Sequence, residues 1–471
     1  MRNGYRVGKR LMECIMSSEI GEDDEVVLRE SRRKTRVYLG NSAWIMADNL
    51  LANFIAFLVL MAVARYYGAD KYGAYAYVFA IAQLFAVIGQ MGLDGLLTRD
   101  LVSSPNDHPR VLGTAGGLRF AGYLIGAIGC LAYGFLLPEH SVTERWLFFA
   151  AFLFIIFTPG QMILDNWFRS RVEARYSSIA RMSGAMAGSA MKIGIILVGG
   201  SVIAVGFAQA ASVALIIAIL LPLYLRRGGP ALHHWRFDPV KAKEMLSECW
   251  LVFAGSALAL IYLKIDQVML RWWEGPEMVG IYSIATRISE VFYFIPAALV
   301  TSFFPRLITL RDESQVVFNQ RFESMLALLA LLAYAIMASV FLLGPTVIML
   351  AFGKAYLAAG PVLMVHVCSM PFIFMRYGFS RWMLIERYNA FSVVSQGLGA
   401  LANVVLNVIL IPRYGMMGAA VATLVSYSAA SYFALLLSQR TRPVFWMMTR
   451  ALLMPWRAVS TIRNLRLGKG I

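Results

Sequence analysis

The sequence predicts an all-α integral membrane protein: about twelve transmembrane helices in two pseudo-symmetric six-helix lobes around a central cavity. Three observations predict this fold class. The 471 residues are 59% hydrophobic and only 15% charged, which is far more apolar than a soluble domain. Apolar stretches of roughly 20 residues, long enough to cross a bilayer, follow one another along the chain. Finally, the second half of the sequence echoes the first.

The apolar stretches divide into six and six around a polar break. We expect spans near 40–64, 74–98, 113–137, 146–168, 179–199 and 202–225, then near 250–273, 278–304, 323–351, 357–384, 390–412 and 415–438. The break is the polar, glycine- and proline-containing segment Arg226–Glu248. The predicted organisation is therefore an N-terminal tail (1–38), an N-lobe (39–225), an inter-lobe loop (226–249), a C-lobe (250–438) and a basic C-terminal tail (439–471) with an interfacial helix near 444–456.

The basic residues predict how the chain is oriented. The net charge is +16, and most of the 43 Lys and Arg residues lie in the two tails and the even-numbered connections. Because loops rich in Lys and Arg stay on the cytoplasmic side, both tails and the inter-lobe loop are predicted to be cytoplasmic. The charge does not form a basic face with interleaved aromatic residues, so no nucleic-acid partner is expected.

Three sequence echoes predict that the halves are related. Arg65–Tyr75 (RYYGADKYGAY) resembles Arg271–Tyr282 (RWWEGPEMVGIY) at an offset of about 206 residues. EARYSS and VGFAQAASV in the first half have counterparts in ERYNAFS and MGAAVATLV at nearly the same offset. Six spans, an even number, separate the matched segments, so both halves enter the membrane in the same direction.

Ionisable residues inside the spans are the candidate site, because a charge in the hydrocarbon region is costly unless it is paired or lines a cavity. The basic candidates are Lys192, Lys264, Arg287, Arg119 and Arg376. Lys192 has no acidic residue within one helical turn. Lys264 lies two residues from Asp266, on another helical face, and Arg287 lies three residues before Glu290, so a local ion pair and a cavity role remain open for Arg287. Long stems would let Arg119 and Arg376 reach the cytoplasmic interface.

The acidic candidates for binding a coupling proton or sodium ion are Asp48, Asp165, Asp266 and Glu290. A structural role competes with this interpretation, most directly for Asp165, which has Arg169 one turn further along. The histidines and the four widely separated cysteines show no metal-ligand spacing, so neither a metal nor another cofactor is predicted.

Two features argue against an enzyme. The sequence contains no GxxxxGK[ST] phosphate-binding loop. The longest predicted outer connection, Pro138–Arg145, is too short to build an extracytoplasmic catalytic domain. A transporter therefore remains, and because the chain does not itself hydrolyse nucleotide in the usual P-loop manner, its energy is expected to come from a gradient or from a partner.

Several motifs in a fixed order resemble one transporter family. They are ARYYGADKYGAYAYV, KIDQVML followed by VGIYSIATRI, FFPRL, FGKAYLAAGPVL and NVVLNVILIPRYGMMGAAVATLVSY. With these motifs the chain is similar, from about Asn41 to Ser438, to the Wzx-type polysaccharide-biosynthesis flippases of the multidrug, oligosaccharidyl-lipid and polysaccharide exporter superfamily. The N-terminal tail is longer than is usual in that family.

The resemblance implies an alternating-access flippase of the bacterial inner membrane. It would move undecaprenyl-diphosphate-linked oligosaccharide repeat units from the cytoplasmic to the periplasmic leaflet for surface polysaccharides such as O-antigen or exopolysaccharide. In that reading Lys192, Lys264 and Arg287 contact the diphosphate, and Arg119 and Arg376 attract it at the cytoplasmic mouth. The implied partners are the lipid-linked oligosaccharide, membrane lipids, and a polymerase and a chain-length regulator of the same pathway.

Two other functions compete with the flippase. An ion-coupled multidrug exporter of the same superfamily would place acidic residues in the cavity to bind cationic drugs, whereas basic residues at least equal the acidic ones here. A membrane glycan polymerase or glycosyltransferase would require the large outer loop or acidic cluster that the sequence lacks.

Overall fold

The computed structural model describes the backbone of residues 22–456 and the side chains of residues 51–456. These residues form helices, short 3-10 turns and connections, and no strand occurs among them. In the N-terminal half the helices are α2 (Glu22–Gln90), α3 (Leu93–Ser103), α4 (His108–Leu136), α5 (Val142–Ser170), α6 (Ala174–Leu197) and α7 (Val202–Arg226). The all-α prediction is confirmed.

The C-terminal half is also helical. Its helices are α8 (Pro239–Glu274), α9 (Pro276–Glu290), α10 (Phe294–Glu313), α11 (Gln315–Phe352), α12 (Ala359–Val367), α13 (Met370–Ile385), α14 (Ala390–Ser431) and α15 (Arg442–Leu453). Short 3-10 turns (η1–η5) lie at Pro105–Asp107, Leu232–His234, Val291–Tyr293, Lys354–Tyr356 and Phe433–Leu437.

By length and hydropathy, the described chain contains eight helical stretches able to cross a membrane, or nine if the bent pair α12 and α13 is one span. Glycines explain most of the difference from the expected twelve. Gly68 and Gly415 have non-helical backbone angles inside α2 and α14, so each of these elements is two helices joined at a sharp bend. α6, which carries Lys192, is not among the eight or nine stretches; counted as a span, it brings the total to twelve.

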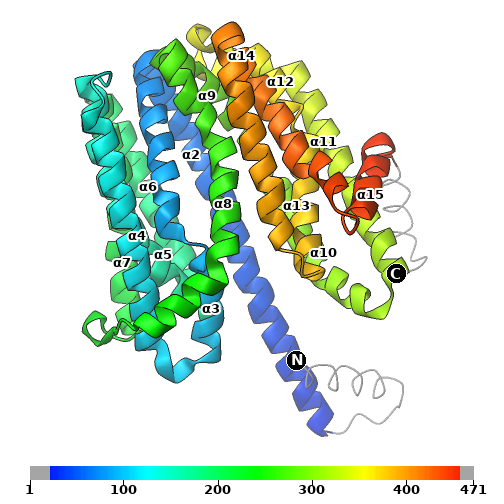
Figure 1. Ribbon diagram of the computed structural model, residues 1–471. Coiled ribbons are helices and arrows are strands. Elements are labelled where there is room, and N and C mark those ends of the chain that lie inside the picture. Colours follow the sequence, from blue (N-terminus) through cyan, green and yellow to red (C-terminus); the bar gives the residue numbers. More distant parts are fainter. Residues whose placement is uncertain (1–21, 457–471) are drawn as a thin grey trace.

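Contacts across the bends show that the chain folds back on itself. A Cβ on Gly418 would lie 2.3 Å from the carbonyl oxygen of Leu410, whereas eight residues of straight helix would separate them by about 12 Å. Residues on both sides of Gly68, among them Ala52 and Gln83, line one common cavity. Figure 1 shows the two halves of α2 side by side.

The backbone supports the sequence repeat. Gly68 (φ 75°, ψ 174°) and Gly275 (φ 88°, ψ 178°) occupy equivalent places in the two echoing motifs and share a conformation that glycine adopts most readily. Gly73 and Gly280, five residues further on in each motif, lie at the contact between the halves. A Cβ on Gly280 would be 2.1 Å from the carbonyl oxygen of Ala69, and one on Gly73 would be 1.7 Å from that of Pro276. The halves thus meet through related glycines.

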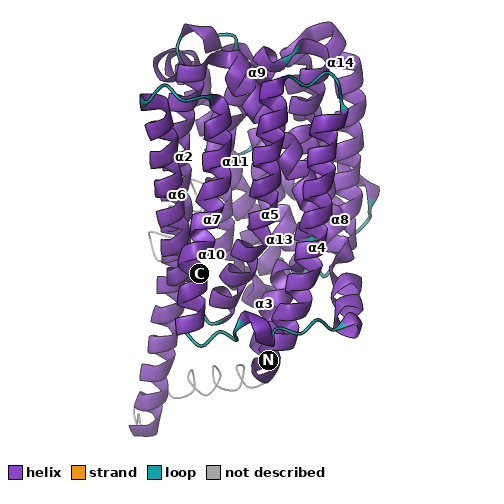
Figure 2. Ribbon diagram, turned by 90° about the vertical axis from the view of Figure 1, so that its left-hand side faces the viewer, coloured by secondary structure: helices purple, strands orange, loops and turns teal. Residues whose placement is uncertain are grey.

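The helices form two lobes. In Figure 1 the N-terminal helices (blue to green) and the C-terminal helices (yellow to red) lie close together at the top and diverge toward the bottom. Figure 2, turned by 90°, shows the helices running roughly parallel to one long axis. We call the top, where the chain passes from α8 to α9, the far end, and the bottom, where the chain passes from α7 to α8, the inter-lobe end.

The connection between the lobes is shorter than the loop predicted at 226–249, because α7 continues to Arg226 and α8 already begins at Pro239. Asp238 accepts backbone hydrogen bonds from Val240 (2.7 Å) and Lys241 (3.2 Å) and so caps the start of α8. These backbone donors, the one from Lys241 foremost, hold the pKa of Asp238 below its ordinary value. At the other end of the chain, the helix predicted near 444–456 is present as α15. α2 already begins at Glu22, inside the predicted N-terminal tail.

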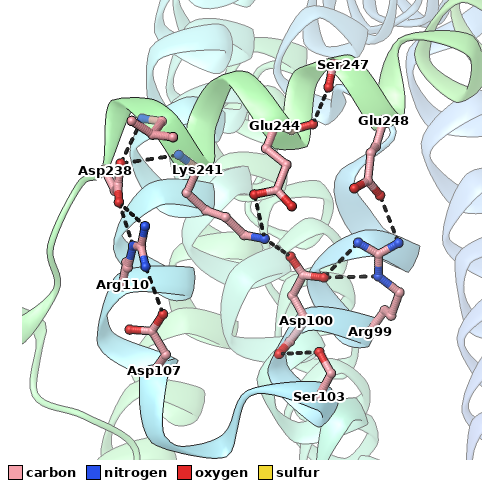
Figure 3. A network of polar contacts seen from close by, with 11 residues as sticks. Arg99, Asp100, Ser103, Asp107, Arg110, Asp238, Lys241, Glu244, Ser247 and Glu248 are labelled. Carbon is pink, nitrogen blue, oxygen red and sulfur yellow. Dashed lines mark hydrogen bonds and ion pairs between the residues drawn. The ribbon is translucent and has the colours of Figure 1, made fainter.

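An ion-pair network fastens the first turns of α8 to the N-lobe (Figure 3). Arg110 in α4 pairs with Asp238, and Lys241 in α8 pairs with Asp100 in α3 at 2.9 Å. Arg99 also reaches Asp100 (2.9 Å), and the remaining members are Asp107, Glu244 and Glu248. α8 therefore begins on the N-lobe and ends in the C-lobe.

Candidate functional site

A cavity of about 810 Å³ lies between the lobes. Both halves of α2 together with α4, α5, α6 and α7 form one wall, and α8 and α9 form the other. Its charged lining residues are Lys192, Arg287 and Glu290, so the lining carries a net positive charge. A cavity of this size within a membrane bundle can take a polar headgroup out of the hydrocarbon.

Lys192 projects into this cavity from α6. Its Nζ donates a hydrogen bond to Oε1 of Gln209 in α7. Among the residues that the structure describes, no carboxylate lies within ion-pair distance of Lys192. Its charge is therefore available to an anion in the cavity.

Arg287, Glu290 and Lys264 form a triad on the C-lobe side. The Glu290 carboxylate accepts from Lys264 Nζ at 3.2 Å and from Arg287 Nη1, also at 3.2 Å. The Lys264 side chain is only 7% exposed, whereas that of Arg287 is 46% exposed. Lys264 is not part of the cavity lining. Because Lys264 also pairs with Glu290, the single negative charge of Glu290 is shared by two cations. A positive charge therefore remains on the exposed side of Arg287, which faces the cavity. The local pair and the cavity position, which the sequence left open for Arg287, both occur.

Asp266 lies inside the C-lobe, away from the triad, and the residue is only 3% exposed. It accepts hydrogen bonds from Tyr282 Oη (2.7 Å), Asn407 Nδ2 (2.6 Å) and the Thr423 hydroxyl. In the part of the chain that the structure covers, no Lys or Arg pairs with it. Asn407 Oδ1 is buried without a partner. Asp266 is thus a buried carboxylate held by neutral donors, next to a free amide oxygen.

Three other predicted residues lie outside the cavity lining. Arg119 is fully buried and donates to Asp94 at 2.6 Å, so it does not reach an interface. Arg376 lies between α13 and α14, where it donates to Ser395 Oγ (2.9 Å) and to the carbonyl of Ala430 (3.2 Å). Asp165 pairs with Arg169 (2.8 Å) and with Arg181 in α6. These contacts hold helices together within one lobe.

Asp48, the fourth acidic candidate, lies outside the described side chains. Clusters of three or more His, Cys, Asp or Glu residues that could hold a metal ion are absent from the described chain.

Sequence reasoning missed most of the polar lining because it weighed only ionisable residues. Amide side chains dominate this lining: Asn53, Gln83, Gln90, Gln161, Gln209 and Gln267. Aromatic rings also contribute: Phe57, Tyr72, Tyr75, Phe79, Tyr123 and Phe154. Glutamines inside apolar runs were a readable signal, because an amide in hydrocarbon also needs a partner. Amides and aromatic rings together suit a ligand rich in hydroxyl groups.

The far end of the cavity is closed by contacts between the lobes. Arg271 at the end of α8 forms a two-point ion pair with Glu144 at the start of α5, with distances of 2.7 and 3.1 Å. Trp272 Nε1 donates to Tyr133 Oη at 3.2 Å, and Tyr356 Oη donates to the Ala64 carbonyl at 2.9 Å. At the inter-lobe end, the described contacts between the lobes are those of the first half of α8.

His140, in the α4–α5 connection, supports this closure from the N-lobe. Its Nδ1 lies 3.1 Å from the Gly134 carbonyl, so this nitrogen carries the proton and Nε2 accepts from Tyr77 Oη at 3.0 Å. Burial holds the pKa of His140 below its ordinary value. The structure therefore favours the neutral ring, with both nitrogens hydrogen-bonded within the N-lobe.

Two related lobes that close on each other at one end and enclose a cavity with cations, amides and aromatic rings in its wall define a class of protein. This is the architecture of an alternating-access transporter, in which rocking of the lobes exposes a fixed central site to each side in turn.

Comparisons with known proteins narrow this class. The family model for "Polysaccharide biosynthesis protein" matches residues 38–310. A curated protein named "Probable flippase AglR", from Haloferax volcanii, is 24% identical over 415 residues, which cover 83% of this chain and 82% of that protein. Because the family model spans more than half of the chain, the protein belongs to the polysaccharide biosynthesis protein family.

Solved structures show the same fold. The inward closed conformation of the lipid II flippase MurJ matches with a TM-score of 0.66 at 15% identity, covering 90% of this chain and 93% of that one. An inward-facing multidrug resistance MATE family transporter of the MOP superfamily matches with a TM-score of 0.62 at 14% identity, covering 91% and 98%. The chain therefore shares its fold with these membrane transporters, and its described part contains eight or nine helical stretches long and apolar enough to span a membrane. The resemblance noted in the sequence is confirmed, and these relatives are flippases and transporters by name, not enzymes.

Proposed function

We propose that this protein flips undecaprenyl-diphosphate-linked oligosaccharide repeat units from the cytoplasmic to the periplasmic leaflet of a bacterial inner membrane, for assembly of a surface polysaccharide such as O-antigen or exopolysaccharide. The main support is the cavity, in which Lys192 and Arg287 offer positive charge and amide, hydroxyl and aromatic side chains line the wall beside them. A diphosphate pairs with the cations, and glycan hydroxyls hydrogen-bond to the amides. The tail of the lipid stays in the bilayer between the lobes.

In this proposal the tails and the inter-lobe end face the cytoplasm, where the basic connections belong. The far end, held by Arg271 and Glu144, faces the periplasm. The described conformation then accepts substrate from the cytoplasmic side. A polymerase and a chain-length regulator of the same pathway would take up the flipped units.

Asp266 is our candidate for the coupling site. Neutral donors hold its carboxylate and the oxygen of Asn407 lies free beside it, an arrangement that can take up a proton or a sodium ion. Glu290 is a weaker candidate because two cations already neutralise it. Asp165 is occupied by two arginines.

The test measures the lipid-linked oligosaccharide pool and its distribution between leaflets in deletion cells that carry plasmid variants. Replacing Lys192 and Arg287 together by Gln removes both charges from the cavity. Charged hydrogen bonds contribute about 1.5–3 kcal/mol each, so each loss should weaken headgroup binding by about 10- to 100-fold. We expect precursor to accumulate on the cytoplasmic face and surface polysaccharide to be lost.

A matched control replaces two exposed cations outside the cavity, Lys354 and Arg440, by Gln. Wild-type export by the cavity variant, with normal membrane levels, contradicts the proposed diphosphate site. An unchanged precursor pool in the deletion strain, together with altered drug efflux, would instead favour the multidrug exporter.

A further inference from the structure

A second cavity, of about 460 Å³, lies behind α5, on the side that faces away from the central cavity. α5 packs between α4 and α7, and the groove runs along this helix between its two neighbours. Representative wall residues are Phe120 in α4, Phe157 and Gly160 in α5, and Ile217 and Leu221 in α7. The lining is almost entirely hydrocarbon, and the helices that carry it are membrane spans.

The groove is open to the bilayer. Phe120 is 52% exposed and Leu232 is 50% exposed, although both belong to its wall. Gly160 leaves space at the bottom of the groove, because it has no side chain there; a Cβ at this position would contact Ile217, with Cδ1 nearest at 3.1 Å. A groove of this kind is filled by a hydrocarbon chain in a membrane.

The inter-lobe connection closes one end of the groove. Trp235 packs against α4 where Gly116 lacks a side chain; a Cβ there would lie 3.0 Å from the indole. The indole Nε1 donates to Tyr224 Oη and to the Pro230 carbonyl, both at 3.2 Å. Trp235 is thus fixed at the end of the groove, at the level where the spans end.

Positive charge lies at the same level. Arg226 ends α7 five residues beyond Leu221, Arg227 is the C-cap of this helix, and Arg236 follows Trp235. All three are exposed, and in the described part of the chain none has a carboxylate within ion-pair distance. The Arg227 guanidinium lies over the Tyr176 ring at 4.2 Å and donates one hydrogen bond, from Nη2, to Tyr176 Oη, so its charge is not neutralised by this contact. Clusters of arginines beside an apolar groove at the membrane surface attract anionic lipid headgroups.

We propose that this groove is a binding site for an anionic phospholipid of the bilayer, with one acyl chain against α5 and the headgroup on Arg226, Arg227 and Arg236. The tail of a transported lipid is not the occupant, because α5 separates the groove from the central cavity: Gln161 and Met162 face the cavity, and Gly160 and Ile163 face the groove. The bound phospholipid fastens the inter-lobe connection to the N-lobe.

Quenching of Trp235 by brominated lipid tests this site. The full chain is placed in phosphatidylcholine nanodiscs that contain a fixed mole fraction of either dibrominated phosphatidylglycerol or dibrominated phosphatidylcholine. The chain has 10 tryptophans, so the signal of Trp235 is the difference between the wild type and Trp235→Phe. We expect dibrominated phosphatidylglycerol to quench this signal at a much lower mole fraction than dibrominated phosphatidylcholine.

Two variants and a control separate the headgroup from the groove. Replacing Arg226, Arg227 and Arg236 by Gln should weaken the preference for phosphatidylglycerol by about fivefold per arginine. A control triple in the C-lobe, with Arg306, Arg440 and Arg442 replaced by Gln, should keep it. Gly160→Leu fills the groove and should remove quenching by both lipids.

Equal quenching of Trp235 by the two lipids, or quenching by neither, overturns the proposal. Native mass spectrometry of the detergent-solubilised protein gives a second test that does not need Trp235→Phe. It compares how much phosphatidylglycerol stays bound to the wild type and to the triple arginine variant. There, equal retention by the wild type and the Arg226, Arg227 and Arg236 variant also overturns it.

Discussion

Glu144→Gln tests whether the far end is a gate. The Glu144 side chain is 2% exposed. Its two carboxylate oxygens accept from Nε and Nη2 of Arg271, in the other lobe, at 2.7 and 3.1 Å. This contact exists only while the far end is closed. Replacing the carboxylate with an amide keeps the size of the side chain but leaves Arg271 without its counter-charge.

The cost follows from the geometry of the pair. Breaking a buried pair from one side typically costs about 3–5 kcal/mol, and Arg271, which is 18% exposed, is only partly buried. We therefore expect a loss of about 2–3 kcal/mol in the closed state alone, since an open far end already solvates both groups. Such a loss shifts the ratio of open to closed molecules by about 30- to 150-fold.

Electron-electron distance measurements can detect this shift. Val198 in the N-lobe is 82% exposed and Tyr414 in the C-lobe is 63% exposed, and both lie at the far end; spin labels on cysteines at these positions report its opening. The native cysteines are replaced first. We expect a longer-distance population in Glu144→Gln that is small or absent in the otherwise unchanged protein.

The matched control is Glu323→Gln. Glu323 pairs with Arg450 with the same two-point geometry (2.9 and 2.7 Å), but both residues belong to the C-terminal half. This variant should leave the distance distribution unchanged. If Glu144→Gln leaves it unchanged as well, the far-end pair does not hold the lobes closed and the argument is wrong.

Three further predictions address closure, coupling and pH. Gly280→Ala places a methyl group 2.1 Å from the Ala69 carbonyl, so it should hold the far end open in the same distance measurement and stop transport, whereas Gly194→Ala, which meets no atom within 4 Å, should do neither. Asp266→Asn should abolish the dependence of transport on the ion gradient while the protein still binds its substrate; retained dependence would exclude Asp266. Because burial lowers the pKa of His140, the folded state loses stability relative to the unfolded chain as the pH falls from about 6.5 through that lowered value. The thermal midpoint should drop over this range in the wild type and less in His140→Gln. Equal drops would exclude His140, which Glu139, Glu144 and Arg271 also face.

The sequence singled out Lys192, which lines the cavity, because a lysine inside an apolar run must either pair with an acidic group or line a cavity. It could not predict the partner of Lys264, because Glu290 lies 26 residues further along the chain on the next helix. Only the packing of α8 against α9 brings the two together. Arg119 is similar: its partner Asp94 is 25 residues earlier. For charges in membrane spans, spacing along one helix predicts local pairs and misses pairs between helices.

The amide lining was hidden for a different reason. A single glutamine lowers the hydropathy of a span little, so Gln83 and Gln209 do not interrupt the apolar pattern that identifies the helices. Their meaning appears only when different helices place them on one cavity wall. The two lobes were predictable, because the motifs around Gly68 and Gly275 resemble each other in sequence. The two glycines also share one backbone conformation.

α9 joins the three parts of the proposed mechanism. Gly280 touches the N-lobe at the far end, Tyr282 donates to Asp266, and Arg287 lines the cavity, all within two turns of one helix. An ion or proton that reaches Asp266 competes for the oxygen that Tyr282 now contacts, and any shift of Tyr282 moves Gly280 and Arg287 with it. A rigid helix of 15 residues cannot reposition one of these groups alone. Binding at Asp266, closure of the far end and the position of the cavity cation are therefore expected to change together.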